Sequence, residues 1–401
     1  MNWPVRKLFA LPAIALVLLL LAACGQTART APVHSTATPH SGLQLAWHSG
    51  VTPGGGIVTA PRGVVAVAPG DGDIAYMCIA NGGARVAIWV THDRAAHWTH
   101  VGDILVATGT NQCYPTVGGL QPTTIVVAVI AAKLGASPPV GYYTSYATFD
   151  GGGTWRKLVG PQSYLVLQVS THAGVIYGYL RVASGPQDVE VPELATSSDQ
   201  MRTWHPILQG FADFGDFVDS AAFWLNPANG ALLVADTNVF WSSADAGAHW
   251  TKITVPGLGA PGENVVVQAP VADQTWRICA ANNNDQDLKN LKPNTLTCSS
   301  DGGQTWQSVP ALNITFTNAK GTFTTPTGVF ALASDGAILA LSSGPAGPWT
   351  QSVYRLAPNA QQWQSLNLAP GSSPNLRYYP APGGGVLWAA MDQNLLTASY
   401  P

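Results

Sequence analysis

The 401-residue chain is poor in charged residues, and above all in glutamate, which occurs only at Glu190, Glu193 and Glu263. Charged residues make up 10% of the sequence, compared with about 25% in an average soluble domain. A chain with so little Glu and Lys is a poor helix former, whereas its 42 Gly and 30 Pro favour turns. The formal net charge of −3 leaves no basic excess to neutralise phosphates, which argues against nucleic-acid binding.

The N-terminal apolar run is too short for an ordinary membrane span. Residues 8–23 fall below the roughly 18–20 residues that a transmembrane helix needs, and Pro12 interrupts them. With Arg6 and Lys7 in front, the segment is typical of a targeting signal. It ends in Leu-Ala-Ala-Cys-Gly, which resembles a bacterial lipobox. The resemblance implies cleavage before Cys24 and attachment of a diacylglycerol to its thiol; an uncleaved signal anchor is the alternative.

We therefore expect three segments: a lipoprotein signal peptide over residues 1–23, a lipidated tether over 24–42 and a folded domain over 43–401. Residues 26–42 are rich in Thr, Ala, Ser and Pro without an apolar period, as in an extended, disordered tether. Either form of attachment places the bulk of the chain outside the cytoplasm, tethered to the bacterial cell membrane.

Cysteine is scarce: there are five, and one of them is Cys24. The other four suit disulfides in an oxidising compartment. Cys279 and Cys298 lie on segments that we interpret as neighbouring strands, on either side of a polar loop. This favours the pairs Cys279–Cys298 and Cys78–Cys113, and the alternative is four buried free thiols.

One short pattern, Ser/Thr-x-Asp-x-Gly-x-Thr-Trp, recurs along the folded segment. Two copies are complete, at residues 148–155 and 299–306, and three are degenerate, at 91–98, 197–204 and 243–250. An Asp side chain can accept hydrogen bonds from N–H groups a few residues on, and Gly supplies a positive φ. The paired residues are Asp93 and Trp98, Asp150 and Trp155, Asp199 and Trp204, Asp245 and Trp250, and Asp301 and Trp306.

This pattern resembles the Asp-box, or BNR, repeat. The resemblance implies a β-propeller in which each box joins the third and fourth strands of a blade, on the face opposite the functional site. It is shared by sialidases, sortilin-type receptors, photosystem II assembly factors and xyloglucan-cleaving hydrolases. The repeat therefore specifies an architecture and no particular ligand.

Tryptophans recur about every 50 residues, a period typical of propeller blades. Trp363 follows a decayed copy of the pattern, and Trp47 precedes the first copy. The segments between them hold short apolar runs split by turns, so we predict a seven-bladed β-propeller of four-stranded antiparallel blades. Leu43–His48 is expected to be the outer strand of the last blade, which closes the ring and removes open edges. Six blades is the runner-up, because residues 322–366 are irregular.

Ligand recognition in a propeller is expected where the loops between outer and inner strands meet the loops between second and third strands. The loop 211–219 interleaves carboxylates with phenylalanines, a combination that suits a sugar site, although a solvated acidic loop is the alternative. The candidate catalytic residues are Asp213, Asp216, Asp219 and Asp236, and the candidate binding residues are Phe214, Phe217, Asp285 and Asp287.

We expect neither a metal nor a cofactor. His92, His97 and His100 lie close in sequence, but His97 stands where the repeat has Thr, and no set of carboxylate ligands accompanies them. The chain has no Gly-x-Ser-x-Gly, P-loop or His-Glu-x-x-His motif.

A sialidase would need three arginines for the substrate carboxylate, together with a Tyr–Glu pair. Arg62 lacks the expected motif, and Glu190 and Glu193 lie just before a repeat rather than at a channel-facing strand start. The missing signatures favour a monomeric, non-catalytic lipoprotein that binds a protein or a glycan. The alternative is a glycoside hydrolase, sialidase-like or other, that uses the acidic residues of the loop face.

Overall fold

The computed structural model describes residues 40–400 with gaps. The chain divides into Met1–Val33, which lies outside the described residues, and a compact unit from His34 to Pro401. No helix in the described part of the chain is long and apolar enough to cross a membrane. The undescribed residues are 1–39, 54–64, 69–70, 81–82, 107, 109, 119–123, 133–140, 159–163, 185–188, 212–222, 227, 237–238, 256–264, 269–276, 283–294, 313, 319–320, 326, 334, 345–346, 367–376, 381–384, 392–393 and 401.

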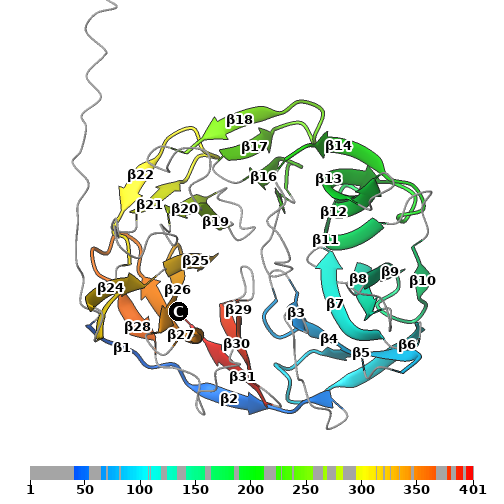
Figure 1. Ribbon diagram of the computed structural model, residues 1–401, viewed down its shortest axis with the longest axis horizontal. Helices are drawn as coiled ribbons and strands as arrows, with labels where there is room; N and C mark the ends of the chain where they lie inside the picture. Colours follow the sequence, from blue (N-terminus) through cyan, green and yellow to red (C-terminus); the bar gives the residue numbers. More distant parts are fainter. Residues whose placement is uncertain are drawn as a thin grey trace, which may run out of the picture. The chain divides into compact units, whose positions relative to one another are not determined.

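Seven blades, each built on four antiparallel strands, follow one another around a ring in chain order, so the predicted seven-bladed β-propeller is confirmed (Figure 1). Blade one is β3 (Val65–Val67), β4 (Ala75–Ala80), β5 (Arg85–Thr91) and β6 (Thr99–Leu105); blade two is β7 (Thr110–Gly118), β8 (Thr124–Ala132), β9 (Gly141–Thr148) and β10 (Arg156–Lys157). Blade three is β11 (Tyr164–His172), β12 (Val175–Ser184), β13 (Val189–Ser197) and β14 (His205–Gln209); blade four is β15 (Phe223–Leu225), β16 (Leu232–Asp236), β17 (Val239–Ser243) and β18 (Thr251–Thr254). Blade five is β19 (Val265–Gln268), β20 (Ile278–Asn282), β21 (Thr295–Ser299) and β22 (Gln307–Val309); blade six is β25 (Thr327–Leu332), β26 (Ile338–Gly344), β27 (Gly347–Leu356) and β28 (Gln364–Leu366). Blade seven is β29 (Arg377–Pro380), β30 (Val386–Met391), β31 (Asn394–Ser399) and the N-terminal strand β2 (Trp47–Gly50).

The ring closes through the N-terminal segment, as predicted. β2 pairs antiparallel with β31 and supplies the outer strand of blade seven, although it occupies Trp47–Gly50 rather than Leu43–His48. The sequence did not predict the strand before it: β1 (His40–Leu43) pairs in parallel with β28 on the outer edge of blade six. One N-terminal segment therefore covers the edges of two neighbouring blades.

An inserted hairpin explains the irregular sequence pattern near blade six. β23 (Ile314–Asn318) and β24 (Gly321–Thr325) form a separate two-stranded sheet between β22 and β25. These strands precede the four strands of the blade, so the segment carries more strand signals than one blade needs. The six-bladed alternative is wrong, because β25 to β28 form a complete blade.

Each blade is buried on both faces, because neighbouring blades cover it on either side. In β8, Ile125, Val127 and Val129 belong to the apolar cluster shared with blade one, whereas Val126 belongs to the cluster shared with blade three. This two-sided burial explains why β8 is a nearly continuous apolar run instead of an alternating one.

The third and fourth strands of six blades are joined by connections of equal length. In five of them an Asp carboxylate closes the turn, and we call residues 91–98, 148–155, 197–204, 243–250 and 299–306 the aspartate turns. Asp150 accepts hydrogen bonds from Thr148 Oγ1 at 2.6 Å and from Thr154 N at 2.9 Å. These bonds hold the pKa of the Asp150 carboxyl well below its usual range. The six connections are residues 92–98, 149–155, 198–204, 244–250, 300–306 and 357–363.

Aspartate turns also pack against the outer strand of the preceding blade. The residue two positions after the Asp makes this contact: a Cβ at Gly152 would lie 2.9 Å from Val101 Cγ2, and one at Gly247 would lie 2.6 Å from Ile207 Cδ1. Both glycines have positive φ, at 109° and 97°. Glycine is needed there for its conformation and for the close approach. The turns are therefore structural parts of the seams between blades.

Candidate functional site

The residues predicted to form a site belong to connections at one end of the ring. Antiparallel topology brings the connections between blades, and those between second and third strands, to the end opposite the aspartate turns. Asp213, Phe214, Asp216, Phe217 and Asp219 lie outside the described residues, as do Asp285 and Asp287. Asp236 is the last residue of β16, but its side chain is not described. The predicted site remains a prediction.

The connection that carries most of these candidates is anchored at both ends. Phe211, at its start, is 4% exposed, and its ring centroid lies 5.9 Å from that of Tyr179. Phe223, at its end, has both backbone groups bound by Gln168, with Nε2 to Phe223 O at 2.8 Å and Phe223 N to Oε1 at 3.3 Å. Phe211 and Phe223 share one apolar cluster between blades three and four.

Glu193, weighed above as a sialidase-type residue, is buried in β13 at 9% exposure. Its Oε2 accepts a hydrogen bond from Gln209 Nε2 at 2.7 Å. The side chain of Glu190 lies outside the described residues.

Two disulfides are present, and they are the pairs that the strand interpretation favoured. Cys78–Cys113 joins β4 to β7 and so links blade one to blade two. Cys279–Cys298 joins register partners on β20 and β21 within blade five.

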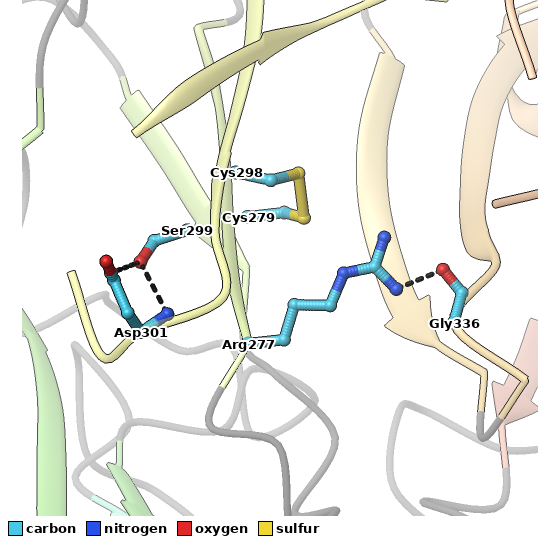
Figure 2. The surroundings of a disulfide bond; sticks show 6 residues. All are labelled: Arg277, Cys279, Cys298, Ser299, Asp301 and Gly336. Atoms are coloured by element: carbon cyan, nitrogen blue, oxygen red, sulfur yellow. Dashed lines mark hydrogen bonds between the residues drawn. A yellow bond between two sulfur atoms is a disulfide. The ribbon is translucent and has the colours of Figure 1, made fainter. Parts of the chain in front are cut away.

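A cleft of about 230 Å³ lies beside the second disulfide, at the aspartate-turn end between blades five and six. Blade five contributes Cys298, Gln307 and Ser308, and blade six contributes Leu356 and Asn359. Figure 2 shows the disulfide with Ser299 and Asp301 of the neighbouring turn on one side and Arg277 on the other.

The cleft occurs at the seam where the aspartate turn has been lost. Pro358 stands where the other turns have Asp, and Leu356 stands where they have a hydroxyl residue. Asn359 keeps the positive φ of the next position, at 61°. Ala360 stands two positions after Pro358, where the other turns have the residue that contacts the preceding outer strand. It lacks a positive φ, and its N–H donates to Ala357 O at 3.0 Å. This connection keeps the length of an aspartate turn but not the carboxylate that closes one.

Trp363 holds the altered connection in place. The indole is fully buried, at 0% exposure, and Nε1 donates to Pro310 O of blade five at 2.9 Å. Trp250 makes the equivalent bond to Ile207 O at 2.8 Å, so the seam keeps its tryptophan contact although the turn has changed.

Arg277 crosses the seam beside the cleft. It is half-buried, directly precedes β20, and donates from Nη1 to the carbonyl of Gly336 in the β25–β26 turn (Figure 2). A Cβ at Gly336 would lie 3.4 Å from Pro358 Cγ, so this turn also contacts the altered connection. The neighbouring Asp335 carboxylate pairs with Arg355, whose side chain is buried.

The lining of the cleft combines one cation, Arg277, with hydroxyl and amide groups and with apolar side chains. No Asp or Glu is among the residues that line it. The cleft could not be predicted from the sequence, because its residues come from distant positions on two blades. The sequence signal that could have indicated the cleft is Pro358, which occupies the Asp position in the decayed copy of the repeat that ends at Trp363.

Two of the three histidines that could suggest a metal, His97 and His100, have carboxylate partners. His97 Nδ1 lies 2.7 Å from Asp93 Oδ2, and His100 Nε2 lies 3.0 Å from Asp103 Oδ1. In the described part of the chain, no group of three or more His, Cys, Asp or Glu residues is placed to hold a metal ion.

No protein-family model matches the chain, and no curated protein matches it. Among solved structures it is similar to YCF48 from Cyanidioschyzon merolae, with 12% identity and a TM-score of 0.50 over 88% of this chain and 99% of that one. YCF48 bound to a D1 peptide gives 9% identity and a TM-score of 0.51 over 91% and 97%. An ancestral GH74 enzyme gives 12% and 0.48, over 91% of this chain and 46% of that one. At these identities the similarity shows the fold alone.

Proposed function

We propose that this chain is a lipid-anchored, extracytoplasmic β-propeller of the Asp-box type that binds a protein or glycan at its loop end without catalysis. The observation that carries the proposal is the difference between the two ends of the ring. At one end, the six connections between third and fourth strands have the same length, and five of them are closed by the same hydrogen bonds.

At the other end the connections differ widely in length. The second and third strands are joined by residues 237–238 in blade four but by 283–294 in blade five. Residues 106–109 lead into blade two, whereas 210–222 lead into blade four. Recognition residues are commonly carried by variable loops on a rigid scaffold. The loop end of blades four and five, where Asp213 to Asp219, Asp236, Asp285 and Asp287 belong, is therefore the proposed binding surface.

The lipobox-like sequence supports the anchor. Cleavage before Cys24 would leave residues 24–39 between the lipid and β1 on the outer edge of blade six. This attachment at the rim would leave the loop end accessible. YCF48, which shares the fold, holds a peptide in one of the similar structures, so propellers of this kind can bind protein segments.

The anchor is tested by following the full-length chain and the Cys24→Ala variant in the producing bacterium. We expect an alkyne-labelled fatty acid to be incorporated into the wild type alone, and the variant to leave the mature membrane fraction. Equal labelling of both chains would contradict the anchor.

Binding is tested with the detergent-solubilised lipoprotein on a glycan array and by crosslinking in cells. The quadruple variant Asp213→Asn, Asp216→Asn, Asp219→Asn, Asp236→Asn is the matched probe. We expect a ligand whose affinity falls in the variant, and no turnover of chromogenic glycosides by either protein. If the wild type hydrolysed a chromogenic glycoside and the variant did not, the non-catalytic role would be wrong and the hydrolase alternative would be supported.

A further inference from the structure

We infer that the cleft between blades five and six is a second binding site, which takes an extended peptide segment of a partner protein with an acidic side chain directed at Arg277. It lies at the end opposite the proposed loop site. The two proposals are independent, and either can fail without the other.

The edge of blade five can pair with an extended peptide. β22 is the outer strand of its sheet, and no further described strand pairs with it. Its residues Gln307 and Ser308 are exposed and line the cleft. Outer strands present unpaired N–H and C=O groups, which an extended peptide can pair with. The neighbouring blade shows such a strand addition within this chain, because β1 pairs in parallel with β28, the outer strand of blade six.

The seam between blades five and six has room for a side chain. At other seams an aspartate turn fills the space beside the preceding outer strand, as Gly303 does against Ile253. Pro358 interrupts that arrangement beside β22, and the cleft of about 230 Å³ lies there. This volume is below the roughly 300–1,000 Å³ of pockets for drug-sized ligands. It suits one or two side chains better than an oligosaccharide, which favours a peptide occupant.

The charge of the cleft favours an acidic ligand. The guanidinium of Arg277 is the cation in the lining, and a guanidinium carries five N–H donors, so it can bind a carboxylate in addition to its present contacts, among them the bond to Gly336 O. The carboxylate of Asp301, in the turn beside the cleft, accepts hydrogen bonds within that turn, from Ser299 Oγ at 2.7 Å and Thr305 N at 2.8 Å.

Apolar residues complete the fit. Val309, Ile338 and Leu356 line the cleft, and they can contact the methylene groups of a Glu side chain. The hydroxyl and amide groups of Ser308 and Asn359 lie in the same lining and can bond to the peptide backbone.

The test uses the full-length protein and a displayed library of random dodecapeptides. Peptides are selected on the wild type and counter-selected on Ser308→Trp, which fills the cleft from an exposed position. We expect the surviving peptides to carry Asp or Glu at one fixed position. Changing that residue to the amide should weaken binding at least tenfold, and so should Arg277→Gln, whereas Arg277→Lys should retain part of the affinity.

Three results would overturn the inference. The first is that no peptide distinguishes the wild type from Ser308→Trp, and the second is that the distinguishing peptides carry no acidic residue. The third is that free glutarate binds as tightly as the peptide, which would make the cleft a site for small acids. Because Arg277→Gln also removes a contact with blade six, its thermal unfolding is measured in parallel. Ser308→Trp leaves Arg277 in place and therefore tests occupancy of the cleft without removing that contact. The quadruple Asp variant should bind the peptide as the wild type does, because its substitutions are at the loop end.

Discussion

Gly50 and Ala95 meet where the ring closes, and here the glycine is on the strand, the reverse of the seams that have glycine in the turn. Gly50 ends β2, and a Cβ at this position would lie 2.6 Å from Ala95 Cβ. The backbones are joined as well, since Val51 N donates to Ala95 O at 2.9 Å. Between blades one and two the glycine is in the turn and the larger residue is on the strand, at Gly152 and Val101. Each of these two seams has room for only one of the two side chains.

The first prediction follows from this pair. Gly50→Ala should destabilise the propeller by about 1–3 kcal/mol, because an added methyl group has no space against Ala95. Adding Ala95→Gly should recover more than half of the loss, since the pair then has the arrangement of Val101 and Gly152, with the glycine in the turn. The free energies of urea unfolding of the two single variants and the double variant measure the coupling.

Gly83→Ala is the matched control, because a Cβ there would have no atom within 4 Å and should leave the unfolding free energy nearly unchanged. Strictly additive effects of the Gly50 and Ala95 changes would contradict a steric contact between them.

The second prediction concerns acid stability. The side-chain hydrogen bond from Thr305, followed by the backbone bond from Thr305 and the bond from Ser299, lowers the pKa of Asp301 to about 2. In the unfolded chain an Asp titrates near 3.9, so around pH 3 the unfolded state binds more protons than the folded state. The contribution of Asp301 is therefore complete above about pH 5 and is lost as the pH falls toward 2.

Asp301→Asn should lower the midpoint of thermal unfolding at pH 7 and flatten its dependence on pH between about 5 and 2. Asp103 lies on β6, where its carboxylate pairs with the exposed Arg85 of β5 and His100 of β6, and gives a control variant, Asp103→Asn. A pH profile of Asp301→Asn parallel to that of the wild type would show that the turn carboxylate does not contribute to acid unfolding.

The number and order of the blades could be predicted because each aspartate turn is a local structure. The residues that close the turn of Asp150 lie within four positions of it, at Thr148 and Thr154. A short sequence window therefore carries the whole signal. Trp363 preserved the period even where the carboxylate was gone, because its buried indole is fixed by Pro310 O rather than by the turn.

Features that depend on distant partners could not be predicted in the same way. β1 has little strand pattern of its own and is ordered through its pairing with β28, whose residues lie far along the chain. The cleft likewise needs Arg277 and Ser308 on one blade and Pro358 on the next, and a single sequence does not show which loops are neighbours. The loop site was predicted from the residue types at 211–219, and residues 212–219 lie outside the described residues.

The third prediction compares the two disulfides. Cys78–Cys113 spans 35 residues and links two blades, whereas Cys279–Cys298 spans 19 residues within one sheet. Removing either should lower the unfolding free energy by about 2–4 kcal/mol. The loop-entropy model makes the loss larger for Cys78–Cys113 by about 0.5 kcal/mol. Urea unfolding of the two double Cys→Ala variants, with the wild type in reductant for comparison, tests this order, and a clearly reversed order would contradict it.

The fourth prediction links the fold to the proposed loop site through Gln168. Its amide binds both backbone groups of Phe223, the residue at which the connection from Phe211 enters blade four. Gln168→Ala should cost about 1–3 kcal/mol, because partly buried backbone groups lose their partner. Gln168→Glu should also destabilise, since a carboxylate can accept from Phe223 N but cannot donate to Phe223 O.

The effect should be local as well as global. Hydrogen exchange of the Phe223 amide should accelerate in both Gln168 variants, and chymotrypsin should cut the connection at Phe214 or Phe217 faster than in the wild type. The exposed Gln362 gives the matched control, and Gln362→Ala should change neither rate. If the Gln168 variants lost stability without faster exchange at Phe223, the amide would support the seam between blades three and four but not the connection. In that case Gln168 would have no part in positioning the loop that carries Asp213, Asp216 and Asp219.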